Sequence, residues 1–197
     1  MAFARIEREA PPKGYEVSWP GAFPFLLSRD VFLEQALFVG QELSEEEFDE
    51  LRRLQRRHEC KAQALRYLAM REHTRYELIL KLQRKGFEAS ESEAVLDELA
   101  DENLLSEYRY ALLFIEQRLR RKSEGRAMMV QRLASKRVNR EDGERALDEL
   151  YSEELVCSYV KSARDEIAAK VGEEQIRNHL QKRGFTSSEI RMALDEE

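Results

Sequence analysis

Few side chains in this sequence have the types and spacings that catalysis or metal binding requires. His58 and Cys60 stand two positions apart on a predicted helix and therefore point to different faces, which does not make a metal ligand pair. A pair of adjacent acids recurs in the phrase "LDEL", as Asp97 with Glu98 and Asp148 with Glu149. Neighbouring helical residues diverge by roughly 100°, whereas a general acid needs a partner and a pocket. We therefore expect surface carboxylates, no metal, no cofactor and no enzyme activity.

Basic side chains give the stronger functional signal, although the net charge of the chain is −6. Residues 52–85 hold 11 basic and 3 acidic side chains, and residues 118–145 hold 10 basic and 4 acidic ones. Such blocks can place basic surface on an acidic protein, or they can be ordinary solvated helix faces. The residues that we expect to bind a partner are Arg84, Lys85, Arg118, Arg120, Arg121, Lys122, Arg126, Arg132, Lys136 and Arg137.

Part of this basic set recurs with a regular period. Arg84 and Lys85 have counterparts in Lys136 and Arg137, and again in Lys182 and Arg183. A feature repeated at the period of an array lies on one side of it, so these cations predict a stripe that tracks phosphates or an acidic protein surface. The alternative is that lysine and arginine in a last helical turn only favour the helix dipole.

A leucine pattern predicts the helices that position these cations. Three leucine pairs are each separated by fourteen residues: Leu82 and Leu96, Leu133 and Leu147, Leu180 and Leu194. Gly86 and Gly184 follow the first helix of their pairs, where a left-handed residue ends a helix, whereas Arg137 replaces the glycine in the middle copy. That middle cap is either strained or different in shape. Expected N-caps follow: Ser90 with Glu93, Asn139 with Asp142, and Thr186 with Glu189.

A longer helix precedes each of these short pairs, which gives nine helices in three units, each ordered long, short, short. Thr74 with Glu77 predicts a further capping box at the start of a short helix. Turns at His73–Thr74, at 123–125 and at Gly172 separate the long helix from the first short one. Such a unit has little core alone and must stack on its neighbours.

The segment before the repeats has a different pattern. "YEVSW" (15–19) and "AFPFLLS" (22–28) predict a β-hairpin, in which Pro24 confines the second strand to a sheet edge. A short helix broken at Gly40 is expected next. Ser44 with Glu47 then caps a helix that runs into the first repeat.

The predicted fold is therefore mainly α: an elongated, curved array of three tandem three-helix units behind a small N-terminal hairpin and helix. We place the N-terminal segment at 1–44, the first unit with its lead-in helix at 45–102, the second unit at 103–152 and the third at 153–197. The sequence shows no secretory signal and no apolar membrane span, so we expect a cytoplasmic protein. We also expect it to be a monomer.

The sequence resembles the RecX family, bacterial regulators of the RecA recombinase. The resemblance rests on "ALRYLAMREHTRYELILKLQRKGF" (64–87), "NLLSEYRYALLFIEQRLRRKSEGR" (103–126) and "MVQRLASKRV" (129–138), and on their order. It implies a module that lodges in the groove of the RecA–DNA filament and reduces ATP hydrolysis, strand exchange and coprotease activity. The resemblance implies that the binding partner is the RecA filament, and single- or double-stranded DNA is a further candidate partner. The alternatives are a helical-repeat scaffold for another partner and a sequence-independent DNA-binding module.

Overall fold

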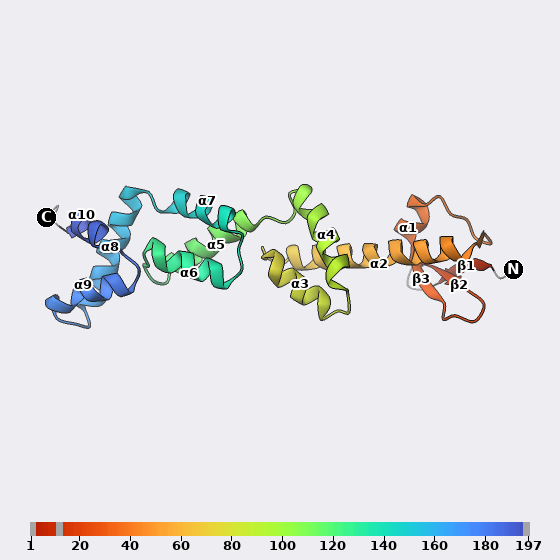
Figure 1. Cartoon of the computed structure of the whole chain (residues 1–197), viewed down its shortest axis with the longest axis horizontal. Coiled ribbons are helices and arrows are strands. Elements are labelled where there is room, and N and C mark those ends of the chain that lie inside the picture. The colour runs from red at the N-terminus through yellow and green to blue at the C-terminus, as the bar shows by residue number, and fades with distance from the viewer. Residues whose placement is uncertain (1–2, 11–13, 195–197) are drawn as a thin grey trace. The chain divides into compact units, whose positions relative to one another are not determined.

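The structure is a computed structural model that describes residues 3–10 and 14–194. Four short strands and ten helices follow one another in this part of the chain, and it contains no helix long and apolar enough to cross a membrane. Figure 1 shows these elements along the chain. The chain divides into two compact units. The first compact unit comprises Met1–Arg66 and Leu82–Asp97, and the second comprises Tyr67–Lys81 and Glu98–Glu197.

The N-terminal strands form one antiparallel sheet in the first compact unit. They are β1 (Ala4–Ala10), β2 (Gly14–Ser18), β3 (Phe25–Ser28) and β4 (Glu42–Leu43), in the order β3-β2-β1-β4. The predicted hairpin is confirmed as β2 and β3, with Val17 opposite Phe25. The predicted edge position of β3, which follows Pro24, is also confirmed. Strands β1 and β4 were not predicted, because β1 contains several charged residues and β4 is two residues long.

A short helix and a long helix follow the hairpin. Helix α1 (Arg29–Glu34) begins at Ser28, whose hydroxyl accepts a hydrogen bond from the Val31 N–H at 3.3 Å. The expected break at Gly40 is wrong, because α1 already ends before Ala36, which has a positive φ of 50°. Helix α2 (Glu45–Leu68) begins with the predicted capping box: Glu47 accepts from the Ser44 N–H at 2.7 Å and donates its own N–H to the Ser44 hydroxyl at 3.3 Å. The 24-residue α2 confirms that one helix runs from this cap into the first repeat.

The core of the N-terminal sheet lies between its strands, α1 and the start of α2. Ile6 and Val17 pair across β1 and β2 and are completely buried. Phe48 of α2 contacts the rings of Trp19 and Phe25, with ring centroids 5.6 and 5.4 Å apart. The alternation of apolar residues in the strands and their helical spacing in α2 therefore meet in one hydrophobic cluster.

The remaining helices follow the predicted order of long, short, short. They are α3 (Arg75–Gln83), α4 (Ala89–Asp101), α5 (Glu107–Leu119), α6 (Arg126–Ser135), α7 (Arg140–Leu150), α8 (Glu153–Ala168), α9 (Glu173–Lys182) and α10 (Ser187–Leu194). We call α2–α4 the first repeat, α5–α7 the second and α8–α10 the third. The mainly helical fold with a small N-terminal sheet is thus confirmed, while the limits of the predicted domains stay a prediction.

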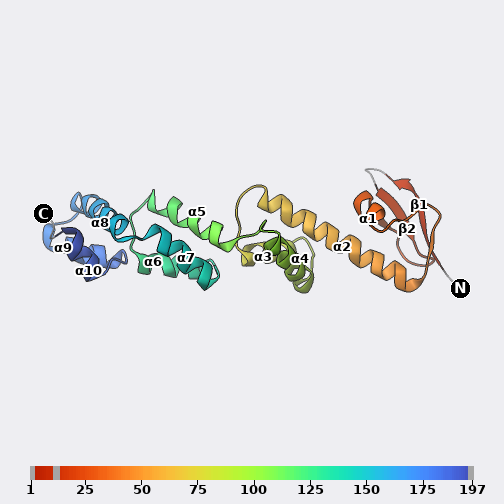
Figure 2. The same ribbon diagram turned by 90° about the horizontal axis from the view of Figure 1, so that it is seen from above.

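The second and third repeats share one core in the second compact unit. Its buried residues run from Ala111 in α5 to Ala193 in α10 and include Met129, Leu147 and Leu180. Figure 2 shows α6 beside α7 and α9 beside α10, as the hairpin pairs of the two repeats. The predicted leucine positions therefore pack inside, and the sharing of one core by two repeats is the arrangement expected of stacked helical units.

Three of the four predicted helix caps in the repeats are present. Asn139 accepts hydrogen bonds from the N–H groups of Glu141 and Asp142 at 2.9 and 3.4 Å, and Thr186 forms a reciprocal box with Glu189. The Thr74 hydroxyl accepts from the Glu77 N–H at 3.1 Å. The cap expected at Ser90 with Glu93 is wrong, because α4 begins one residue before Ser90 and the Glu91 carboxylate binds the Glu88 N–H at 2.9 Å instead.

Candidate partner-binding surface

Three turns with the same backbone geometry carry the recurring cations. In each turn two backbone N–H groups donate to carbonyls at the end of the preceding helix. The donor and acceptor residues are Gly86 to Gln83 and Phe87 to Leu82 in the first turn, Arg137 to Ala134 and Val138 to Leu133 in the second, and Gly184 to Gln181 and Phe185 to Leu180 in the third. The left-handed residues have φ values of 88° at Gly86, 58° at Arg137 and 90° at Gly184. The middle cap therefore has the same shape as the other two, and Arg137 accepts the backbone strain that glycine avoids.

The cations of the first turn lie in the first compact unit. Arg84 and Lys85 are exposed, and neither has a polar partner among the described residues. The turn itself is held by α2, because the Arg56 guanidinium lies 4.7 Å from the centroid of the Phe87 ring and donates to the Gly86 carbonyl. Glu91 forms an ion pair with Arg56 at 3.5 Å. Arg56 is thus a structural cation, whereas Arg84 and Lys85 are available to a ligand.

The cations of the second turn lie in the second compact unit. The Arg137 guanidinium lies 4.9 Å from the centroid of the Tyr76 ring, which attaches this turn to α3. Lys136 lines a hollow of about 300 Å³ together with Arg71, Tyr110, Leu113 and other residues. Burial raises the pKa of Tyr110 to about 12, so its hydroxyl stays protonated at neutral pH and can donate a hydrogen bond.

Two of the predicted partner-binding arginines are engaged inside the protein. The Glu124 side chain is only 2% exposed, and its carboxylate accepts hydrogen bonds from Arg132 at 2.6 and 2.8 Å and from Arg118 at 3.2 and 3.2 Å. The Tyr151 hydroxyl donates to the Glu124 carbonyl at 2.9 Å. Burial raises the pKa of Glu124, but the hydrogen bonds and charges of Arg132 and Arg118 outweigh it and hold the pKa below its usual value.

Some of the other predicted residues of the second repeat form ion pairs within the protein, and some do not. Arg126 binds Glu144 at 2.6 Å and Asp148 at 2.7 Å, which brings one of the "LDEL" carboxylates into an ion pair. Arg120 makes an exposed pair with Glu116 at 3.6 Å. Arg121 is exposed, and neither it nor the half-buried Lys122 has an ion pair with any other described residue. The cations free to bind a ligand are therefore a subset of the predicted ones.

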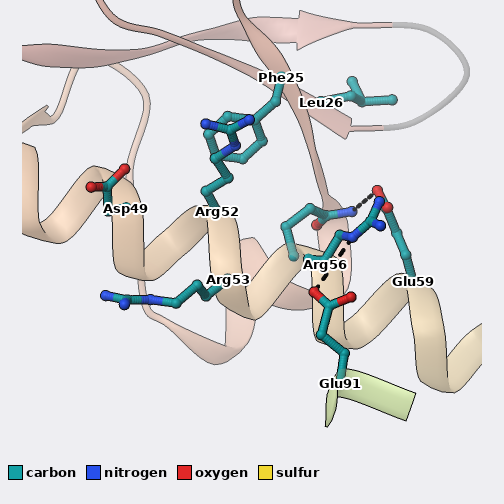
Figure 3. A pocket seen from close by; sticks show the side chains of 9 residues that line it. Phe25, Leu26, Asp49, Arg52, Arg53, Arg56, Glu59 and Glu91 are labelled. Atoms are coloured by element: carbon teal, nitrogen blue, oxygen red, sulfur yellow. Dashed lines mark hydrogen bonds and ion pairs between the residues drawn. The ribbon is translucent and has the colours of Figure 1, made fainter. Parts of the chain in front are cut away.

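A hollow beside the basic helix α2 was not among the predicted sites. It has a volume of about 540 Å³ and lies between β3 and α2 (Figure 3). Three arginines line it, Arg52, Arg53 and Arg56, and so do three carboxylates, Asp49, Glu59 and Glu91. The opposite charges balance, so this hollow has no electrostatic preference for an anion. Within the described residues no group of acidic, histidine or cysteine side chains is arranged to hold a metal ion.

Lys170 and Lys182 are two further cations outside the ten predicted partner-binding residues, although the predicted stripe includes Lys182. They line a hollow of about 310 Å³ in the second compact unit together with Lys122. Lys182 belongs to that stripe because "KRGF" repeats the turn pattern of the first unit. Lys170 follows the end of α8 and is the counterpart of Arg121, since each stands directly before the residue whose N–H closes the turn, Val171 and Lys122.

Helix triplets with a shared core, capped by cation-bearing turns, define this chain as a helical-repeat protein with a small β-sheet at its N-terminus. Comparison with known proteins gives a match of residues 60–99 to the family model described as RecX, first three-helix domain. The regulatory protein RecX of Prosthecochloris aestuarii is 36% identical over 138 residues, which cover 68% of this chain and 89% of that relative. The regulatory protein RecX of Halorhodospira halophila is 37% identical over 139 residues, which cover 66% of this chain and 83% of that protein.

The chain therefore belongs to the RecX family. Solved structures agree on the fold. A crystal structure of regulatory protein RecX aligns with a TM-score of 0.74 at 21% identity, covering 99% of this chain and 100% of the other. The crystal structure of RecX from Lactobacillus salivarius aligns with a TM-score of 0.63 at 20% identity, covering 72% and 96% of the two chains.

Proposed function

We propose that this protein is a regulator of the RecA recombinase. It binds as a monomer in the groove of the RecA–DNA filament and reduces ATP hydrolysis, strand exchange and coprotease activity. The observation that carries the proposal is the 36% identity to a regulatory protein RecX over 89% of that relative. The protein acts by binding and not by catalysis, and its binding partner is the filament.

Exposed turn cations are the groups that we assign to the filament. Arg84 and Lys85 in the first repeat and Arg121 in the second are exposed and have no polar partner among the described residues. Cations without internal partners interact with phosphates or acidic side chains at no cost of breaking an ion pair. Arg118 and Arg132 contribute differently: they hold the Glu124 turn in place, so their effect on filament binding is through the fold.

The test measures the DNA-dependent ATPase of RecA at increasing concentrations of the wild-type protein and of Arg84→Glu/Lys85→Glu. The variant is expected to require at least about tenfold more protein for half-inhibition, because two favourable charges become two unfavourable ones. The matched control is Lys161→Glu/Arg191→Glu, which makes the same charge change at two exposed positions of the third repeat. Equal loss in both variants would reject the assigned surface, and no effect of the wild-type protein would reject the proposed function.

A second titration distinguishes filament binding from binding to DNA alone. Sequence-independent DNA binding would give an affinity for naked DNA that falls steeply with salt. We expect binding to the RecA filament to be much tighter than binding to the same DNA without RecA. Equal affinity for the two would favour the alternative of a DNA-binding module, and sedimentation of the free protein checks that it is a monomer.

A further inference from the structure

The turn after the long helix has a different length in the third repeat. The carbonyls of Tyr67, Arg118 and Ile167 accept the same turn hydrogen bond, from the N–H groups of Arg71, Lys122 and Val171 at 3.4, 3.0 and 3.1 Å. From these equivalent positions the next helix is capped seven residues later at Thr74 and at Gly125, but only five residues later at Gly172. The third repeat therefore lacks two residues at this turn.

The missing residues correspond to a buried polar group in each of the other repeats. In the second repeat this group is Glu124, which Arg118 and Arg132 bind. In the first repeat it is His73, which is 1% exposed and contacts Glu77 and Lys81. The third repeat has no residue at this place, and the counterparts of Arg118 and Arg132 are Ile167 and His179.

A hollow of about 310 Å³ lies at this position in the third repeat. Ile167 and Val171 provide an apolar floor, and the ammonium-bearing side chains of Lys122, Lys170 and Lys182 line the hollow. None of these lysines has an ion pair with a described residue. No described carboxylate lines the hollow. Arg183, which also lines it, is paired with the Glu166 carboxylate at 2.6 Å, and Glu166 is not among the lining residues. The His179 ring also lines the hollow, and its Nδ1 lies 2.9 Å from the Gln175 carbonyl oxygen.

Helix ends alone do not account for this arrangement. Lys182 is the last residue of α9, and Lys122 and Lys170 follow the ends of α5 and α8, where a cation favours the helix dipole without any ligand. The second repeat brings equivalent helix ends together, and there the cations hold the Glu124 carboxylate. Convergence of these helix ends therefore accommodates a carboxylate in the second repeat. In the third repeat Ile167 and His179 stand in the places of the two arginines, and the lysines that line the hollow are Lys122, Lys170 and Lys182, with no carboxylate among its described lining residues.

We propose that this hollow receives a carboxylate side chain from an acidic segment of a partner protein, in the place that Glu124 fills in the second repeat. The lysines bind the carboxylate, and the apolar floor of Ile167 and Val171 contacts the methylene stem of a glutamate. This site goes beyond the proposed RecA regulation and is tested without RecA. A phosphate of nucleic acid is the competing ligand, and the experiment separates the two.

The probe is a fluorescein-labelled peptide of repeated Ser-Glu-Gly, which copies the sequence of residues 123–125, and its binding is measured by fluorescence anisotropy. Wild-type protein is expected to bind it, and a repeated Ser-Gln-Gly peptide is not. The Lys122→Gln/Lys170→Gln variant is expected to bind at least about fivefold more weakly, whereas the matched control Lys161→Gln/Arg191→Gln stays within about twofold of wild type. Absence of peptide binding, or equal loss in both variants, would overturn the proposal.

Two further measurements complete the test. Labelled dodecathymidylate replaces the peptide in the same titrations, and tighter lysine-dependent binding of this oligonucleotide would make the hollow a nucleic-acid site and overturn the proposal. Val171→Glu supplies a carboxylate from the chain itself and is expected to abolish peptide binding while the protein remains folded. Val160→Glu, at a completely buried core position, is expected to unfold the protein. Unfolding by Val171→Glu as well would show that the hollow does not stabilise a carboxylate.

Discussion

Glu124 shows at the scale of single residues how a charged group can determine a turn. Its carboxylate is buried and receives two hydrogen bonds from each of two arginines, and these arginines are about one-third exposed. An acid in this position is stable only because both partners are present, since a buried charge without compensation costs several kcal/mol. Arg118 and Arg132 therefore contribute to the fold whether or not they also meet a partner.

The first prediction concerns this carboxylate. Glu124→Gln is expected to lower the free energy of unfolding of the second compact unit by about 2–4 kcal/mol, because two arginines lose their counter-charge. Urea denaturation followed by circular dichroism measures the change. Glu116→Gln is the control: its pair with Arg120 is exposed, so the expected loss is below about 0.5 kcal/mol. Similar losses in the two variants would contradict the structural role of Glu124.

A second prediction concerns the pH dependence that His73 introduces. Burial lowers the pKa of His73 below its ordinary value of 6.5, and the hydrogen bond to Glu77 opposes this shift only in part. The unfolded chain thus binds the proton more readily than the folded chain, so this contribution to stability is complete above pH 6.5 and is lost as the pH falls below it. The His73 ring also lies 3.3 Å from the Lys81 ammonium, which a second positive charge would repel.

Urea denaturation at several pH values tests this sign. Between pH 7 and pH 5 the wild-type protein is expected to lose up to about 1.4 kcal/mol per pH unit from this residue. His73→Gln is expected to be less dependent on pH in this range, whatever its stability at pH 7. Glu77 and Glu124 have lowered pKa values and titrate at lower pH, so they do not obscure the effect. An unchanged slope in His73→Gln would contradict the prediction.

At the scale of elements, the second and third repeats meet through backbone atoms. The Gly125 N–H donates to the Arg183 carbonyl at 2.8 Å, and a Cβ atom at Gly125 would lie 2.1 Å from the Gly184 carbonyl oxygen. A Cβ at Gly184 would in turn lie 2.6 Å from the Met128 nitrogen. Both positions thus require glycine because two backbones approach each other, and Gly184 requires it also for its left-handed φ.

A third prediction follows from this approach. Gly125→Ala is expected to destabilise the second compact unit by more than about 2 kcal/mol, because the contacting atoms belong to the backbone and cannot rotate away. Gly172→Ala is the matched control, since Gly172 also precedes a short helix but a Cβ there meets nothing within 4 Å. It is expected to cost less than about 1 kcal/mol. Thermal unfolding measures the melting temperatures of the two variants. A lower melting temperature for Gly172→Ala than for Gly125→Ala would contradict the prediction.

Local sequence patterns were sufficient for most elements and insufficient for contacts between repeats. The leucine spacing and the caps at Asn139 and Thr186 depend on residues within one helix, so they could be predicted. Glu124 carries no such signal, because its partners lie six and eight positions away on different helices and a solvated acid looks the same in sequence. Strand β1 was missed for a similar reason, since its pairing with β2 and β4 decides its conformation.

The sequence predicted which cations belong to the candidate site, but it did not predict which of them form ion pairs within the protein. Sequence indicated ten cations, and the structure places two of them on a buried acid and one on two exposed carboxylates. Whether an arginine is free depends on the side chains that the fold brings beside it. The hollow of the third repeat was not predicted either, because its lining residues come from three separate segments that only the fold brings together.

At the scale of the molecule, two hydrophobic clusters are distinct. One contains the N-terminal sheet, α1 and the start of α2, and the other extends over the second and third repeats. Each cluster contains buried residues from elements that are distant in sequence, such as Ala4 with Leu51 and Ala111 with Ala193. Within the second cluster neither repeat has a separate core, so the two repeats are expected to fold together.

A fourth prediction tests this dependence by truncation. A chain that ends at Tyr151 lacks the third repeat and so loses the part of the shared hydrophobic cluster that α8–α10 contribute. Amide hydrogen exchange is expected to show loss of protection throughout α5–α7, while the strands and the start of α2 keep theirs. Full protection of α5–α7 in the truncated chain would show that the second repeat is stable alone and would contradict the shared core.

The glycine contact between the second and third repeats also limits how such an array can be lengthened. Duplicating the second repeat would place Arg137 where the contact with Gly125 uses Gly184, and an arginine side chain does not fit against that backbone. Conversely, Arg137 suits the boundary with the first repeat because it stacks on Tyr76. Each boundary between repeats therefore requires its own residue at the turn, glycine in one case and arginine in the other. The residues of these turns consequently fix the order in which the repeats can follow one another.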